Sequence, residues 1–251
     1  MNYEEYKNAI DKRISNRRFT GSPIGEEKLR KLQEIVDSYN KESGLSMQLI
    51  IGDSAPFDGK QASGLFQGTA GYLALIGKKG DPDRMEKEGY YGEMFVLEAT
   101  LMGLGTCWVA SSFGKDKSKA HVGEDEILDL AIAFGYAEKK LSIKEKMIRM
   151  VLGKKQRTIE DVAPNVRSAP DWFRNGVNAV MKAPSTKNTR AFCFLFRDNI
   201  AIAQTVGNHE RVMVDLGIAK LHFKIGVSKG EWELGNNAAY NQEAHQNSYV
   251  Q

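Results

Sequence analysis

Two segments of this chain predict helices that are apolar around most of their circumference. Residues 90–104 are apolar on nearly every face, and residues 212–225 are apolar on more than one face. A surface helix carries a single apolar stripe, so these two helices must be enclosed by protein on several sides. Glycine-containing segments occupy similar places in both, GYYGE at 89–93 and GIAKL at 217–221. This likeness indicates an internal duplication, although two unrelated buried helices are equally compatible with it.

Shorter elements flank the two apolar helices. Amphipathic helices are predicted to begin near Asn2 and at Glu26, and a third follows Pro170. Short apolar or β-rich runs predict strands at 47–51, 72–76, 106–110, 192–196 and 232–234, and a further apolar run covers 127–134. The polar tail after Asn236 has little hydrophobic periodicity, which predicts an extended or partly disordered arm.

The charge balance excludes some classes of partner. The chain has 35 lysines and arginines against 32 acidic residues, a formal net charge of +3. This balance is too even for a nucleic-acid or membrane-surface protein, so any anion site must be local. The basic stretch at 139–157 contains no aromatic side chain on which bases could stack, which argues against a nucleic-acid interface there.

Several other features indicate a cytoplasmic protein without a metal. Glu98 and Thr100 interrupt the longest apolar segment, which stays short of the roughly 18 to 20 residues of a membrane helix. The amino terminus lacks the apolar core of a signal peptide. Cys107 and Cys193 are too few for a disulfide framework or a zinc cluster, and both fit the core of a protein in a reducing compartment. The four histidines show no metal-ligand spacing, and His222 is interpreted as a hydrogen-bonded core residue.

A basic motif follows the first predicted helix. Arg13, Ser15 and Arg17 form an R-x-S-x-R pattern. Guanidinium groups offer paired donors that match phosphate oxygens, and a hydroxyl adds a directional hydrogen bond. The motif therefore suits a phosphomonoester, although a solvated basic helix end remains the alternative interpretation.

A second motif, APSTKN at 183–188, forms a turn between a helix and the strand at 192–196. Its hydroxyls and amide can donate and accept hydrogen bonds to a ligand, although an ordinary capped turn remains the alternative interpretation. A third segment, MGLGTCWVAS at 102–111, joins a buried helix to a strand. Its glycines allow close backbone approach, and it is not a dinucleotide fingerprint because it lacks the G-x-G-x-x-G spacing.

In this order and with these spacings, the three segments resemble the nitroreductase family of FMN flavoproteins over most of the chain. The resemblance implies that the R-x-S-x-R arm binds the FMN phosphate, that backbone amides after G-L-G-x-C-W face flavin N5, and that a later basic pair reaches the phosphate or pyrimidine side. The residues that match these roles are Arg13, Ile14, Ser15 and Arg17 for the arm, Trp108, Val109, Ala110 and Ser111 for the N5 loop, and Lys155 and Arg157 for the basic pair.

One departure from the family pattern is informative. The P-S-x-x-N-x-Q-P loop is absent after the second helix and appears instead in the second half, where Arg190 and Ala191 replace the usual glutamine and proline. This placement is similar to a subgroup, the TM nitroreductases, in which one chain resembles a fused dimer. The resemblance implies an α+β fold of antiparallel sheets packed with helices, in two pseudo-symmetric halves. Residues 1–160 would supply the arm and the N5 loop, and residues 161–251 would complete one site through Pro184, Ser185, Thr186 and Asn188.

The resemblance also implies an activity. The expected protein is an FMN-dependent oxidoreductase that uses NAD(P)H to reduce small acceptors such as nitroaromatics or quinones. The flavin itself would perform the chemistry, so no catalytic acid is required. The functional unit would be a monomer with one FMN per chain. A flavin-binding sensor or storage protein without turnover is the alternative.

Overall fold

The computed structural model describes residues 1–57, 65–110, 112–138, 147, 150 and 157–243. The chain forms two compact units, each discontinuous in sequence. The first comprises residues 1–11, 85–94 and 151–251, and the second comprises residues 12–84 and 95–150. Each unit contains a four-stranded antiparallel sheet, so the expected α+β class is confirmed. The division of the chain after residue 160 stays a prediction.

The second unit is a sheet with the strand order β1-β2-β4-β3. Its elements are α2 (Glu26–Ser43), β1 (Gln48–Ile51), η1 (Ala55–Phe57), β2 (Gly71–Lys78), β3 (Gly105–Val109), η2 (Lys115–Lys117) and β4 (Glu126–Gly135), and α3 (Arg84–Leu101) contributes residues to both units. Strand β2 is buried along seven of its eight residues, which shows that both faces of the sheet are covered. Phe57 of η1 and Phe66 of a loop pack in the apolar cluster on one face, and Phe95 of α3 packs against Phe134 of β4.

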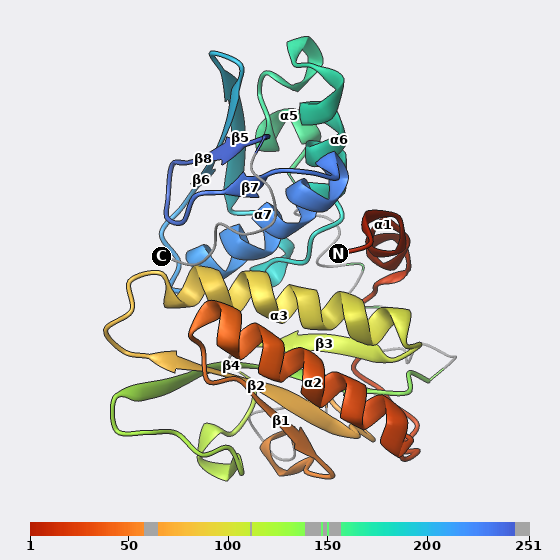
Figure 1. Ribbon diagram of the computed structural model, residues 1–251. Coiled ribbons are helices and arrows are strands. Elements are labelled where there is room, and N and C mark those ends of the chain that lie inside the picture. Colours follow the sequence, from red (N-terminus) through yellow and green to blue (C-terminus); the bar gives the residue numbers. More distant parts are fainter. Residues whose placement is uncertain (58–64, 111, 139–146, 148–149, 151–156, 244–251) are drawn as a thin grey trace. The chain divides into compact units, whose positions relative to one another are not determined.

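The first unit has a sheet with the strand order β5-β6-β8-β7 (Figure 1). Its elements are α1 (Tyr3–Lys12), α5 (Ile159–Val162), η3 (Val166–Ser168), α6 (Asp171–Val180), η4 (Thr186–Asn188), β5 (Phe192–Arg197), β6 (Ile200–Thr205), α7 (Val212–Val227), β7 (Glu231–Trp232) and β8 (Ala238–Asn241). The sheet and helices α6 and α7 enclose a largely aromatic core, in which Phe223 contacts the rings of Phe194, Trp232 and Tyr240.

The expectation of an extended arm after Asn236 is wrong for residues 238–241. This segment is strand β8, which pairs with β6 on one side and with β7 on the other. Tyr240 points into the core and is only 3% exposed. Hydrogen bonds to two neighbouring strands stabilise a segment whose own strand propensity is weak, and this tertiary effect is not visible in local sequence. Residues 244–251 lie outside the described part of the chain.

The two sheets repeat one topology. In each sheet, two consecutive strands pair antiparallel and a long helix follows them. Two further strands then complete the sheet, and the second of these pairs with the second strand before the helix. Helix α3 occupies this place after β2, and α7 occupies it after β6. The expected repetition of two similar halves is therefore confirmed at the level of topology.

Glycines allow α3 and α7 to touch through their backbones. A Cβ atom added to Gly89 would lie 2.1 Å from the carbonyl oxygen of Val214, and one added to Gly217 would lie 2.1 Å from the carbonyl oxygen of Glu86. Each glycine thus contacts the residue three positions before the other glycine, so the crossing is reciprocal. Only glycine permits an approach this close.

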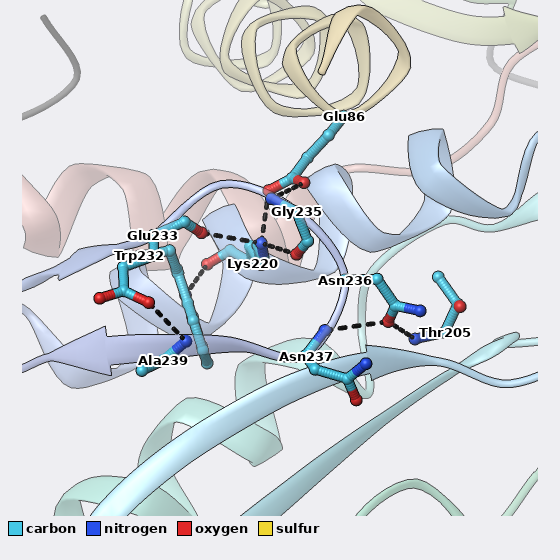
Figure 2. Close-up of polar contacts among 9 residues, drawn as sticks. All are labelled: Glu86, Thr205, Lys220, Trp232, Glu233, Gly235, Asn236, Asn237 and Ala239. Atoms are coloured by element: carbon cyan, nitrogen blue, oxygen red, sulfur yellow. Dashed lines mark hydrogen bonds and ion pairs between the residues drawn. The ribbon is translucent and has the colours of Figure 1, made fainter. Parts of the chain in front are cut away.

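Buried charges on α7 are paired around this crossing. Lys220 is fully buried, and its ammonium donates to Glu86 and to the carbonyl oxygens of Glu233 and Gly235 at 3.0 and 2.9 Å (Figure 2). The second carboxylate oxygen of Glu86 accepts a hydrogen bond from the Gly235 amide at 2.7 Å. A buried ammonium needs such partners because losing its hydration is costly. The ion pair therefore also fastens the loop between β7 and β8.

His222 is a second paired group on α7. Its Nδ1 atom lies 3.1 Å from the carbonyl oxygen of Ala179, and its Nε2 atom lies 2.9 Å from a carboxylate oxygen of Glu93. A carbonyl oxygen can only accept, so Nδ1 carries a proton. The interpretation of His222 as a satisfied core residue is confirmed.

We expect Gly89→Ala and Gly217→Ala each to destabilise the protein by about 3 kcal/mol, because the added methyl group would overlap a backbone carbonyl. In an open helix the same change would be stabilising by up to about 1 kcal/mol through helix propensity. Denaturant unfolding of the variants measures the difference.

Gly80→Ala is the matched control, because nothing lies within 4 Å of a Cβ atom at that turn. Its stability should stay within about 0.5 kcal/mol of the wild type. Equal stability of Gly89→Ala, Gly217→Ala and this control would contradict a backbone-to-backbone crossing.

Candidate functional site

The basic arm lies beside strand β3 in the second unit. Ser15 forms a parallel bridge with Thr106, and the Asn16 amide donates to the Thr106 carbonyl oxygen at 2.8 Å. Two motifs that are about ninety residues apart in sequence, R-x-S-x-R and G-L-G-T-C-W, are therefore adjacent in space. The glycine of the second motif makes this possible, because a Cβ atom on Gly105 would lie 2.8 Å from the side-chain amide of Asn16.

The polar residues Arg13, Ser15 and Arg17 alternate in sequence with Ile14 and Asn16. All three are half-buried, whereas Ile14 is 48% exposed. Half-buried guanidiniums interact with an anion more strongly than fully solvated ones, because water screens them less. Two arginines and a serine thus occur within five residues of the chain, in a segment whose backbone lies next to the start of β3.

The strand after the glycines fixes the start of the predicted N5 loop. Trp108 pairs with Ile132 and Val109 with Ala131. The Val109 side chain lies in the apolar core at 1% exposure, so it is not available to a ligand. Ala110 follows at a half-buried bend, and Ser111 lies outside the described residues.

The second predicted segment, residues 184–190, belongs to the first unit. Pro184, Ser185, Thr186 and Asn188 are all half-buried. Lys187, Asn188 and Arg190 have φ angles of 50°, 59° and 49°, in the left-handed region that residues other than glycine rarely adopt. Such conformations cost free energy and persist only where surrounding contacts impose them. The loop is therefore held in a specific shape.

Two arginines hold the end of this loop. Arg157 donates to the carbonyl oxygens of Arg190 and Phe192 at 2.9 and 2.7 Å and also to that of Asp161. Arg190 in turn donates to the carbonyl oxygens of Arg157 and Met181 at 2.9 and 2.8 Å. Burial lowers the pKa of the Arg190 guanidinium. Arg190 thus ties the end of the loop to the backbone at Arg157 and Met181, outside the loop. The predicted contact of Arg157 with FMN stays a prediction, and Lys155 lies outside the described residues.

Asp215 holds the beginning of the loop, and sequence analysis did not single it out as a site residue. Its two carboxylate oxygens lie 2.9 and 3.0 Å from the Thr186 amide nitrogen, and one of them accepts from the Thr186 hydroxyl at 3.2 Å. The side chain is on the first turn of α7 and only 2% of the residue is exposed. The sequence signal that could have indicated Asp215 is its place as an acidic residue in the first turn of a largely apolar helix.

Burial controls the protonation of this region. Loss of hydration raises the pKa of Asp215 to about 7, although the hydrogen bonds from Thr186 oppose the rise. The Nε2 atom of His209 lies 3.5 Å from the same carboxyl group. Burial, and then the positive charges of Arg211 and Lys187, lower the pKa of His209. His209 is therefore a neutral imidazole near pH 7 and forms no strong ion pair with Asp215.

Among the described residues, no helix is both long enough and apolar enough to cross a membrane. The same part of the chain contains no group of three or more histidine, cysteine, aspartate or glutamate side chains placed to hold a metal ion. Cys107 and Cys193 are both buried thiols, as their assignment to the core predicted.

Comparison with known proteins gives consistent similarities. The family described as "Putative TM nitroreductase" matches residues 5–227. A crystal structure from Thermotoga maritima, described as a "putative nitroreductase", has a TM-score of 0.66 and 18% identity and covers 95% of this chain and 94% of that chain. A nitroreductase family protein from Clostridium novyi has a TM-score of 0.44 and 19% identity over 53% of this chain and 86% of its own. None of the curated proteins matches the sequence. The first structural similarity shows that the chain has the nitroreductase fold.

We expect Asp215 to make stability depend on pH. Its pKa is about 7 in the folded protein and near 3.8 in the unfolded chain, so the folded state binds more protons between these values and stability falls as pH rises through them. The penalty is absent below pH 4 and reaches about 4 kcal/mol above pH 7. The stability of Asp215→Asn relative to the wild type should therefore increase between pH 4 and pH 8, as measured by urea unfolding.

Asp171→Asn provides the control, since Asp171 is also a first-turn acid but its side chain is 82% exposed. Its difference from the wild type should stay nearly constant with pH. A constant difference for Asp215→Asn as well would show that Asp215 has an ordinary pKa.

Proposed function

Because this chain belongs to the TM nitroreductase family, we propose that it is an FMN-dependent oxidoreductase that uses NAD(P)H to reduce small acceptors. Nitroaromatics and quinones are the proposed acceptor classes. The observation that carries the proposal is the placement of the R-x-S-x-R arm against β3, the strand that contains the G-T-C-W part of the second motif. This placement would join a phosphate-binding donor set to a loop suited to a flavin ring.

The donor set of the arm fits the phosphate of FMN. A phosphomonoester carries nearly two negative charges near neutral pH, and Arg13 and Arg17 supply two positive charges within five residues. The Ser15 hydroxyl adds a hydrogen bond, and the bridge to Thr106 fixes its position on β3. We therefore assign the phosphate to Arg13, Ser15 and Arg17, with Ile14 contributing through its backbone.

The strand end and the loop fit the ring. The backbone at Val109 and Ala110 would face flavin N5, and Trp108 and Ser111 flank this position in sequence. We assign the pyrimidine edge and ribityl hydroxyls to Pro184, Ser185, Thr186 and Asn188 on the family resemblance. The Ser185 hydroxyl accepts a hydrogen bond from the Arg190 amide at 2.9 Å and keeps its own hydrogen to donate. When bound, FMN supplies the redox chemistry, and the residues named here bind and orient it.

We expect purified protein to bind FMN and to oxidise NADH or NADPH when a nitroaromatic or quinone is present. Arg13→Glu should raise the dissociation constant for FMN by about a hundredfold or more, because it replaces a charge-assisted hydrogen bond with repulsion. Fluorescence titration with FMN measures the affinity, and steady-state absorbance at the nicotinamide band measures turnover.

Arg30→Glu is the charge-matched control, since this exposed side chain on α2 pairs only weakly with Glu34 at 3.9 Å. It should leave FMN affinity and turnover unchanged. Fully flavinated protein without turnover on any acceptor would favour a sensor or storage role. Protein that takes up no FMN would refute the proposed function.

A further inference from the structure

The loop at residues 185–190 needs an anchor that its own sequence does not provide. Three of its residues are in the left-handed region, none of them is glycine, and η4 includes the left-handed Lys187. The arginine contacts hold only the carboxyl end of the loop, at Arg190. Its amino end requires a separate contact.

We propose that Asp215 is a positioning residue, which holds Thr186 and thereby fixes loop 185–190 in the conformation that the ring-side contacts to FMN require. This inference rests on the proposed function. It assigns Asp215 no contact with the cofactor or with substrate.

The contact between Asp215 and Thr186 is specific in geometry. The Thr186 backbone amide points between both carboxylate oxygens, at 2.9 and 3.0 Å, while its hydroxyl donates to one of them. Both polar hydrogens of Thr186 are thus satisfied by one side chain. If that acceptor were removed, a half-buried backbone amide would lose its partner, which is costly enough to favour another loop conformation.

Asp215 is itself rigidly placed. It lies two residues before Gly217, where α7 contacts the backbone of Glu86. Helix α7 is also fixed by the pairs from Lys220 to Glu86 and from His222 to Glu93. The hydrogen bonds within the loop, such as that from the Asn188 amide to the Ser185 carbonyl oxygen, join residues only a few positions apart. They shape the loop but do not attach it to the rest of the unit, whereas a carboxyl group on so constrained a helix can define its position.

The acceptor oxygens of Asp215 matter here more than its negative charge. Within the described residues, the charged or titratable groups around it are His209 at 3.5 Å, with Lys187 and Arg211 near that imidazole, and the α3 acids Glu86 and Glu93 are paired with Lys220 and His222. Asparagine keeps one acceptor oxygen for Thr186, whereas alanine keeps none. The two substitutions therefore separate positioning by hydrogen bonds from a requirement for charge.

The experiment compares Asp215→Ala, Asp215→Asn and Thr186→Val with the wild-type full-length chain. FMN affinity is measured by fluorescence titration, and amide hydrogen exchange of residues 185–190 is measured by mass spectrometry with and without FMN. We expect Asp215→Ala to weaken FMN binding about tenfold or more and to accelerate exchange in this loop. Asp215→Asn should stay within about threefold of the wild type and keep its flavin absorbance spectrum, and Thr186→Val should show a loss of about threefold to fivefold.

Asp171→Ala is the matched control, because it removes an exposed first-turn acid from α6 in the same unit. It should change neither readout. If Asp215→Ala is too unstable to purify, exchange of the Thr186 amide in the wild type still decides, because this amide donates to both carboxylate oxygens of Asp215. Exchange of that amide as fast as an unprotected one would overturn the proposal.

The outcomes separate the two proposals. FMN binding by the wild type with unchanged affinity and exchange in Asp215→Ala would overturn the positioning role and leave the proposed function intact. If the wild type takes up no FMN, the proposed function fails, and hydrogen exchange alone then decides whether Asp215 fixes the loop.

Discussion

The backbone contact between α3 and α7 fixes the positions of the buried side chains of α7 in the first unit. Two glycines remove the side chains that would separate the helices, and each glycine meets a backbone carbonyl of the other helix. This contact leaves no room for sliding or rotation, so the residues of α7 have fixed positions. Lys220 and His222 consequently meet Glu86 and Glu93, and Asp215 lies where it can hold Thr186.

The sequence predicted most of the elements because their signals are local. Gly44 ends α2 in the left-handed conformation, as a glycine at that place predicts, and strands β1 and β2 form at the apolar runs that predicted them. The apolar helices, the turn at Pro184 and the core histidine are also where pattern and composition placed them. Strand β6 was not predicted, although Asp198 and Asn199, both with positive φ, form the tight turn that joins it to β5.

The relations that give the site its shape are long-range, and sequence does not reveal them. Lys220 and Glu86 are 134 residues apart, and each alone would be interpreted as a surface charge. The contact of Arg157 with the cofactor is implied by the family resemblance and stays a prediction, and no local sequence pattern reveals the hydrogen bonds of Arg157 to three carbonyl groups. Only the family resemblance predicted that the arm and β3 contribute to one site. Their contact, the bridge between Ser15 and Thr106, joins residues that are far apart in sequence and leaves no local pattern.

The proposed FMN site depends on the binding of the flavin phosphate by Arg13, Ser15 and Arg17. Calorimetric titration of wild type and Arg13→Glu with FMN and with riboflavin, which lacks the phosphate, measures the contribution of these residues. The wild type should bind one FMN per chain much more tightly than riboflavin, and Arg13→Glu should weaken FMN binding while leaving riboflavin binding nearly unchanged. Equal affinity of the wild type for the two flavins, or an equal loss for both in the variant, would contradict the claim.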